Sequence, residues 1–71
     1  MMTRKWAALN STGTWKVSVE EYSYKDGSLH YSFRDRFGRP SDVDHDEAME
    51  IIKNWKMTDI TEQMKEEGWI L

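Results

Sequence analysis

Two alternating runs joined by a glycine turn constrain this chain more than any other feature. Apolar residues take every second position in both runs: Trp15, Val17 and Val19 in the first, and Leu29, Tyr31, Phe33 and, after a gap, Phe37 in the second. Side chains alternate between the two faces of a strand. The pattern therefore predicts a β-hairpin over residues 15–37 with one apolar face.

The length of the connecting loop decides which residues share that face. A two-residue turn at Asp26-Gly27 would put the valines opposite the face of Phe33, unless a bulge at Glu20-Glu21 restored the phase. A three-residue loop, Lys25-Asp26-Gly27 with Gly27 in the left-handed region, gives these pairs: Val19 with Phe33 and Trp15 with Phe37. We favour the three-residue loop because both apolar sets then share one face.

The opposite face of the hairpin is expected to be polar and mostly basic. Its candidate partner-binding residues are Lys16, Tyr22, Tyr24, His30, Arg34 and Arg36. The simpler interpretation is a solvated sheet face whose tyrosines reflect β propensity. The alternative is a contact surface, because Tyr and Arg are enriched at protein interfaces.

One more strand and two helices are expected beside the hairpin. Arg4–Leu9 reads as a first strand, folded back by the turn-forming run Asn10-Ser11-Thr12-Gly13, and a loose N-terminal arm is the alternative. Gly38-Arg39-Pro40 should end the sheet, because proline donates no ladder hydrogen bond. The expected fold is α+β, a single domain over residues 1–71. It consists of a three-stranded antiparallel β-meander packed against one long and one short C-terminal α-helix.

The first helix is predicted from Asp44 to Lys56. Asp44 and Glu47 have the spacing of a capping box, and the apolar stripe has the period of a helix. The stripe that should cover the apolar sheet face consists of Ala48, Ile51, Ile52 and Trp55. Its phase is lost at Met57-Thr58, which predicts a break there. One continuous helix is the alternative.

A second helix is expected from Ile60 to Glu67, with Ile60 and Met64 on its inner edge. Gly68 suits its C-terminal cap, and Trp69 then falls where a Schellman motif packs an apolar residue against Met64. The apolar terminus Trp69-Ile70-Leu71 either packs on the domain, for example as a short fourth strand, or inserts into a partner. We favour packing, since so small a domain needs the buried area.

Composition excludes several classes of protein. The 71 residues contain no cysteine, so disulfides and thiolate metal sites are absent, as is common in a reducing cytoplasm. No apolar run reaches the roughly 20 residues of a membrane helix, and no signal peptide is evident. We therefore expect a cytoplasmic protein without membrane contact.

Metal binding and catalysis are not expected. The acidic run from Asp42 to Glu47 resembles a calcium loop, but Glu47 and Lys53 stand where that loop needs glycine and a final glutamate. The two histidines fall on different predicted elements, so no nucleophile–base pair is evident. The chain is accordingly expected to be no enzyme and to need no cofactor.

Charge is divided unevenly along the chain. Residues 1–41 carry seven Lys/Arg and four acids, a net +3, whereas residues 42–71 carry three lysines and nine acids, a net −6. The acidic helix face predicted to bind a basic partner surface comprises Asp46, Glu50, Glu62, Glu66 and Glu67. The sequence thus indicates a non-enzymatic module that binds another protein, as a regulator or inhibitor of phage or mobile-element origin.

The alternative function is nucleic-acid binding by the basic, aromatic sheet face, since β-ribbons can enter the major groove. Trp15-x-Val17-x-Val19, a glycine turn, a second arm and Glu47-Ala48 opening a helix give an outline that resembles the arm-binding domains of phage integrases. The resemblance is one of architecture and involves no specific motif. The net charge of −3 argues against tight, non-specific binding of nucleic acid. The sequence leaves the partner's identity and the oligomeric state open.

Overall fold

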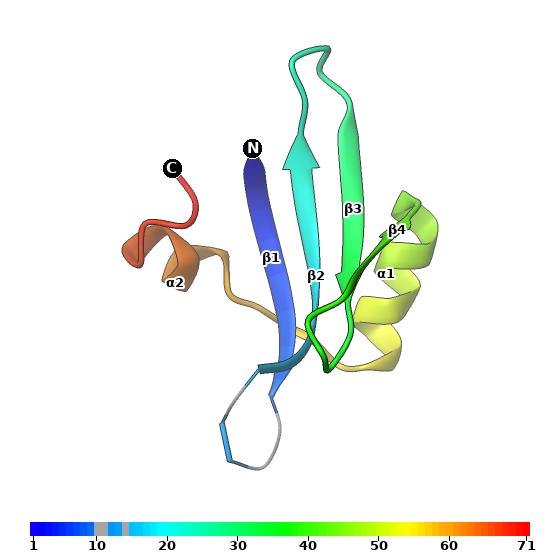
Figure 1. Ribbon diagram of the computed structural model, residues 1–71, viewed down its shortest axis with the longest axis vertical. Helices are drawn as coiled ribbons and strands as arrows, with labels where there is room; N and C mark the ends of the chain where they lie inside the picture. The colour runs from blue at the N-terminus through cyan, green and yellow to red at the C-terminus, as the bar shows by residue number, and fades with distance from the viewer. Residues whose placement is uncertain (10–11, 14) are drawn as a thin grey trace.

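A computed structural model describes residues 1–9, 12–13 and 15–71 of the chain (Figure 1). Within these ranges the elements are β1 (Met2–Leu9), β2 (Trp15–Ser23), β3 (Leu29–Arg34), β4 (Pro40–Val43), α1 (His45–Asn54), β5 (Thr58–Asp59) and α2 (Thr61–Glu66). The predicted α+β class is confirmed, with an antiparallel sheet and two helices. The three-stranded meander is incomplete, because β4 and β5 extend the sheet on either side in the order β4-β3-β2-β1-β5.

The central hairpin has the predicted register. Val19 pairs with Phe33, and the backbone N–H of Tyr24 donates to the carbonyl of Ser28 at 3.0 Å across the three-residue loop. Gly27 has a φ of +87°, which glycine adopts without strain. Val17, Val19 and Tyr31 are buried, so this part of the predicted apolar face is confirmed, whereas Leu29 at the loop end is 52% exposed.

Phe37 departs from that register. β3 ends at Arg34, and the chain turns back at once, so Phe37 lies in a tight turn and is 70% exposed. The carboxylate of Asp35 stabilises this turn by accepting hydrogen bonds from the backbone N–H groups of Phe37 and Arg39 at 2.9 and 3.0 Å. The predicted pairing of Phe37 with Trp15 is therefore wrong. The turn expected at residues 10–13 and the side chain of Trp15 fall partly or wholly outside the described part of the chain.

The two helices lie on opposite faces of the sheet. Trp6 and Ala7 are neighbours in β1 and so face opposite sides. Beneath α1 the buried residues are Trp6, Val19, Tyr31 and Ala48, whereas beneath α2 they are Ala7, Ile60, Met64 and Ile70. The buried positions of Ile60 and Met64 confirm the predicted inner edge of α2.

Both outer strands were missed by the sequence analysis. Pro40 begins β4 instead of ending the sheet, which the edge position allows because a strand's first residue can lack its N–H donor. β5 pairs Thr58 and Asp59 with Ala7 and Trp6 at the other edge. The predicted break at residues 57–58 is confirmed, and the alternative of one continuous helix is excluded.

The helix caps follow local chemistry. Asp44 accepts a hydrogen bond from the backbone N–H of Glu47 at 2.8 Å, as the capping prediction requires. Gly68 has a φ of +85°, and the N–H of Trp69 donates to the carbonyl of Met64 at 2.9 Å, which completes the Schellman motif. The same motif ends α1, where Lys56 occupies the left-handed position with a φ of +52°.

Two tryptophans expected in the core are exposed. Trp55 is 48% exposed at the C-cap of α1, whereas Met49 and Met57 pack against the core. Trp69 is 68% exposed, whereas its neighbour Ile70 is 4% exposed and packs with Met64. The terminus therefore packs through one residue, without forming a strand, and leaves the other two residues on the surface.

Candidate functional site

The polar sheet face is not the solvated surface that its sequence suggested. Glu20 is 2% exposed at the centre of this face, and Ser18 and Ser32 beside it are also buried. α2 and the tail that follows it cover the β1 side of the same face. Two of the six predicted sheet-face residues, Tyr22 and Arg34, are partly buried and contact Glu20, whereas the other four are exposed.

Glu20 is the centre of a buried polar cluster. Arg34 Nε lies 3.2 Å from Glu20 Oε1, Lys5 Nζ lies 4.0 Å from Oε2, and the Tyr22 hydroxyl donates to Oε2 at 3.1 Å. Burial, followed by the charge of Glu20, raises the pKa of Tyr22. The hydrogen bond to Glu20 raises the pKa of Arg34. Arg34 and Tyr22 thus compensate a buried carboxylate. The Arg34 side chain is 38% exposed, and both residues also line a cavity of about 430 Å³.

The other predicted sheet-face residues are divided between the two ends of the hairpin. Tyr24 and His30 stack at the loop end, with ring centroids 4.0 Å apart and an interplanar angle of 24°. Lys16 and Arg36 lie at the opposite end, where β2 begins and β3 has ended. The six residues therefore do not form the single contact surface that was predicted.

The predicted acidic helix face is also divided. Asp46 and Glu50 lie on α1, whereas Glu62 and Glu66 lie on α2 and Glu67 is its C-cap. Because these helices cover opposite faces of the sheet, the five exposed carboxylates do not form one surface (Figure 1). Glu62 is moreover 3.5 Å from Lys65 Nζ.

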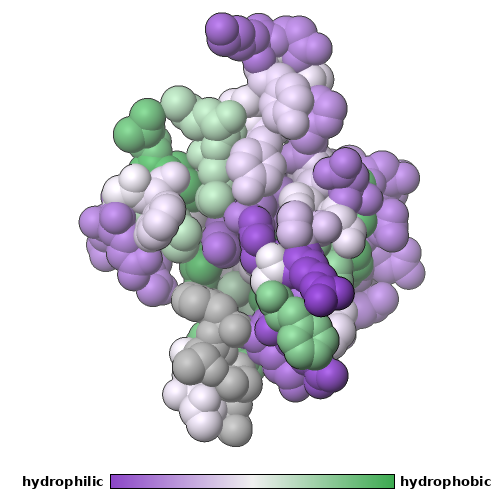
Figure 2. Space-filling view, in the orientation of Figure 1, coloured by the Kyte–Doolittle hydropathy of each residue, from purple (hydrophilic) through white to green (hydrophobic). Residues whose placement is uncertain are grey.

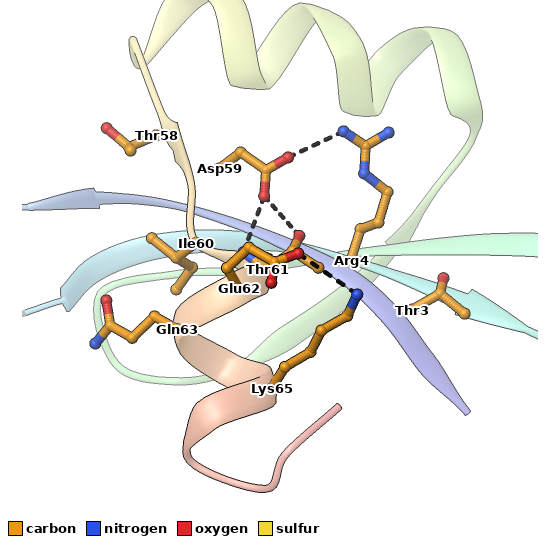
Figure 3. Close-up of a pocket in the computed structure, with 9 residues that line it drawn as sticks. All are labelled: Thr3, Arg4, Thr58, Asp59, Ile60, Thr61, Glu62, Gln63 and Lys65. Atoms are coloured by element: carbon orange, nitrogen blue, oxygen red, sulfur yellow. Dashed lines mark hydrogen bonds and ion pairs between the residues drawn. The ribbon is translucent and has the colours of Figure 1, made fainter. Parts of the chain in front are cut away.

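A cavity of about 570 Å³ lies between β1 and α2 (Figure 3). Its charged side chains pair with one another: Arg4 Nη2 lies 3.0 Å from Asp59 Oδ2, and Asp59 Oδ1 accepts from the Thr61 N–H at 2.9 Å. Partial burial opposes ionisation of Asp59, but the hydrogen bonds from Thr61 and Arg4 outweigh it and lower its pKa. These contacts join β5 and α2 to β1, which is a structural role.

One end of the molecule combines exposed aromatic and basic side chains. We call it the basic–aromatic end, and it comprises Lys16, Arg36, Phe37, Arg39, Lys53, Trp55 and Lys56. Three segments contribute these residues: the start of β2, the β3–β4 turn, and the end of α1. Hydrophobic and strongly hydrophilic atoms adjoin over the β3–β4 turn in Figure 2.

A cavity of about 370 Å³ opens at this end between the sheet and α1. It is lined by Lys16, Val17, Phe33, Asp35, Arg36 and Trp55. Val17, Phe33 and Trp55 supply apolar walls, whereas the charged residues supply its rim. This cavity also shows that the β3–β4 turn and the end of α1 lie next to each other in space.

Among the residues that the structure describes, no carboxylate lies within ion-pair distance of the cations of the basic–aromatic end, although the charges of Arg39 and Arg36 act on Asp35. Hydrogen bonds from the backbone N–H groups of Arg39 and Phe37 hold the pKa of Asp35 below its usual value, so this acid stays ionised within the turn. The Arg36 guanidinium lies 4.8 Å from the centre of the Phe37 ring. The side chains of Arg36 and Phe37 therefore place a positive charge and an aromatic ring at the same point of the surface.

At this end, sequence reasoning identified Lys16, Arg36 and, as a phosphate contact, Arg39. A repeated local pattern marks the others: Arg36-Phe37-Gly38-Arg39 and Lys53-Asn54-Trp55-Lys56 each enclose an aromatic residue between cations. Aromatic residues flanked in this way are less favourable in a core, since the cations must reach water. That pattern could have shown that Phe37 and Trp55 lie at the surface.

The fold and this end define a small α+β sheet domain with one exposed basic and aromatic surface. Comparisons with protein-family models, curated proteins and solved structures found no match. Among the described residues, no three acidic or histidine side chains are placed to hold one metal ion. No helix in the described ranges has the length and apolar character needed to cross a membrane.

Proposed function

We propose that this chain is a non-enzymatic binding module, a regulator or inhibitor of another protein, and that it contacts its partner through the basic–aromatic end. The observation that carries this proposal is the 70% exposure of Phe37 and the 48% exposure of Trp55 beside an apolar cavity. Large aromatic residues and arginine dominate the energetics of protein interfaces. Leaving two such rings in water lowers the stability of so small a protein, and burial against a partner would recover it.

The nucleic-acid alternative has less support, because the residues on which it depended are divided between separate places. Arg34 and Tyr22 are held by Glu20, and Tyr24 and His30 lie at the far end of the hairpin from Lys16 and Arg36. The basic–aromatic end could contact phosphates, but bases stack on exposed rings and do not require an apolar cavity. A protein partner makes use of both the cations and the cavity.

The test compares proteins captured from an extract of the native host, with nucleic acid digested in a parallel sample. A Phe37→Ser/Trp55→Ser variant should lose a protein that the wild type captures, because both exposed rings are removed. Leu29→Ser is the matched control, since Leu29 is also exposed and lies at the other end of β3. Circular dichroism checks that each variant is folded.

One outcome of this experiment would contradict the proposal. If folded Phe37→Ser/Trp55→Ser captures the same proteins as the wild type while Leu29→Ser loses them, the interface lies at the loop end of the hairpin. A Phe37→Ser single variant covers the case in which loss of Trp55 unfolds the protein, because Phe37 lies in an exposed turn.

A further inference from the structure

We infer that the basic–aromatic end binds an acidic segment of a partner protein, which inserts one large apolar side chain into the cavity between Phe33 and Trp55. This inference rests on the proposed function and names the chemistry of the partner. It has three independent supports: the cavity walls, the local excess of positive charge, and the residue chosen at the end of α1.

The cavity walls select an apolar side chain. Val17 and Phe33 come from the buried face of the sheet, and Trp55 closes the cavity from the end of α1. Placing a charged group between such walls would cost its hydration without a partner. A volume of about 370 Å³ is at the small end of binding pockets, which suits a single large side chain better than a folded surface.

The rim selects negative charge around that side chain. Two cations line the cavity, Lys16 from β2 and Arg36 from the β3–β4 turn. Three more cations lie on the same turn or at the end of α1: Arg39, Lys53 and Lys56. Asp35, the acid on the rim, accepts hydrogen bonds from two backbone N–H groups, and its negative charge offsets one of these cations. The C-terminus of α1 adds only about half a negative charge, so this end remains strongly positive. Complementary charge would orient an acidic segment across it.

The residue at position 56 also indicates that positive charge is favoured at this end. Both helices end in a Schellman motif, and the left-handed position is Gly68 in α2 but Lys56 in α1. Glycine adopts this conformation freely, whereas lysine is strained there. The cation beside Trp55 is thus kept at a cost to stability, as expected for a residue that serves binding.

The test titrates the full chain into a fluorescein-labelled peptide that has one phenylalanine between two runs of glutamate and aspartate. Fluorescence anisotropy should show saturable binding that weakens as salt rises to about 0.15 M. A peptide with alanine in place of phenylalanine should bind about tenfold more weakly, because it lacks the inserted side chain. A peptide with lysines in place of the acids should not bind.

Protein variants locate the site. Arg39→Glu with Lys53→Glu should weaken binding of the phenylalanine peptide at least about tenfold. Both residues are exposed and lack an ion-pair partner, so the fold should remain. Lys25→Glu, in the loop at the opposite end of the hairpin, is the matched control and should bind as the wild type does.

Three results would overturn the inference. Equal binding of the phenylalanine and alanine peptides would show simple ion exchange without insertion. Tighter, salt-sensitive binding of a labelled oligothymidylate would identify single-stranded nucleic acid as the occupant. Self-association at low salt that is lost in the Arg39→Glu/Lys53→Glu variant would identify the occupant as a second copy of this chain.

The inference and the proposed function can fail separately. If no peptide binds but Phe37→Ser/Trp55→Ser still loses a captured protein, the end is an interface whose partner is not an acidic segment. If that variant also captures the same proteins as the wild type, both proposals fail.

Discussion

At the scale of single residues, the contrast between Lys56 and Gly68 separates what the fold requires from what it tolerates. The two positions have the same hydrogen-bond pattern: the N–H of Met57 donates to Ile52 as the N–H of Trp69 donates to Met64, at 3.0 and 2.9 Å. Only the α2 position carries the residue that the left-handed conformation favours. Lys56 is therefore the place to look for a conflict between stability and binding.

Lys56→Gly should stabilise the protein by about 0.5–1 kcal/mol. Relief of the left-handed conformation gains about 1–2 kcal/mol, and the greater freedom of glycine in the unfolded chain removes about 0.4–1 kcal/mol of this. The same change should weaken binding of the acidic phenylalanine peptide, because it removes a cation beside Trp55. Urea denaturation and peptide anisotropy measure the two effects.

Lys53→Gly is the control for that prediction. It removes a neighbouring cation from the interior of the last turn of α1, where glycine costs about 0.5–1 kcal/mol. The two variants should thus weaken binding alike while changing the urea midpoint in opposite directions. If Lys56→Gly were as destabilising as Lys53→Gly, the left-handed strain assigned to Lys56 would be wrong.

Residues whose role is local were predictable from the sequence. Gly27, Asp44 and Gly68 each satisfy a turn or cap whose chemistry is complete within a few residues. The exposure of Trp55 and Trp69 was not predictable from the sequence. An apolar period shows which side of a helix faces inward, but it does not show how far the sheet extends beneath that helix. β3 ends at Arg34, so a cavity lies where Trp55 was expected to pack.

At the scale of elements, α2 depends on packing. It has only six residues, and its N-cap residue Ile60 makes no side-chain capping hydrogen bond. A helix this short is unstable alone, because few hydrogen bonds repay its nucleation. Ile60, Met64 and Ile70 pack with Ala7 of β1, and they provide the apolar contacts of this face.

Ile70→Ala should therefore cost about 2–5 kcal/mol, the usual loss for a buried aliphatic residue. Such a loss is a large part of the total stability of a small domain, and urea denaturation would measure it. Leu71→Ala is the matched control, because Leu71 is fully on the surface, and it should change stability by less than about 0.5 kcal/mol. Similar effects of the two variants would mean that the tail does not pack through Ile70.

The two outer strands explain why the polar sheet face was misjudged. β4 and β5 are short, and their exposed residues, such as Ser41, Asp42 and Thr58, carry no alternating apolar pattern. They are strands because they pair with β3 and β1, and no local sequence pattern predicts that pairing. The pairing of β5 with β1 then leads α2 to the face opposite α1, which the sequence analysis had expected to be a solvated or contact surface.

At the scale of the whole molecule, both faces of the sheet bury a carboxylate beneath a tyrosine. Glu20 and Glu21 are consecutive in β2 and so face opposite sides. Tyr22 donates to Glu20 at 3.1 Å, and on the α1 side Tyr31 donates to Glu21 at 2.8 Å. Burial, together with its neighbouring glutamate, raises the pKa of each tyrosine. The protonated hydroxyls thus contribute to the stability of the whole sheet.

Stability should fall in alkaline solution as a result. A tyrosine whose pKa is higher in the folded state stabilises the fold fully below its unfolded pKa of about 10. That contribution is lost as pH rises through the folded-state pKa. Urea midpoints measured from about pH 8 to about pH 11 should fall less steeply for Tyr31→Phe than for the wild type. At neutral pH this variant should lose only about 1 kcal/mol, because Thr3 still donates to Glu21 at 2.8 Å.

Tyr24→Phe, at an exposed position outside the glutamate pairs, should follow the wild-type curve. If Tyr31→Phe follows it too, the pair of Tyr31 and Glu21 does not control the alkaline loss.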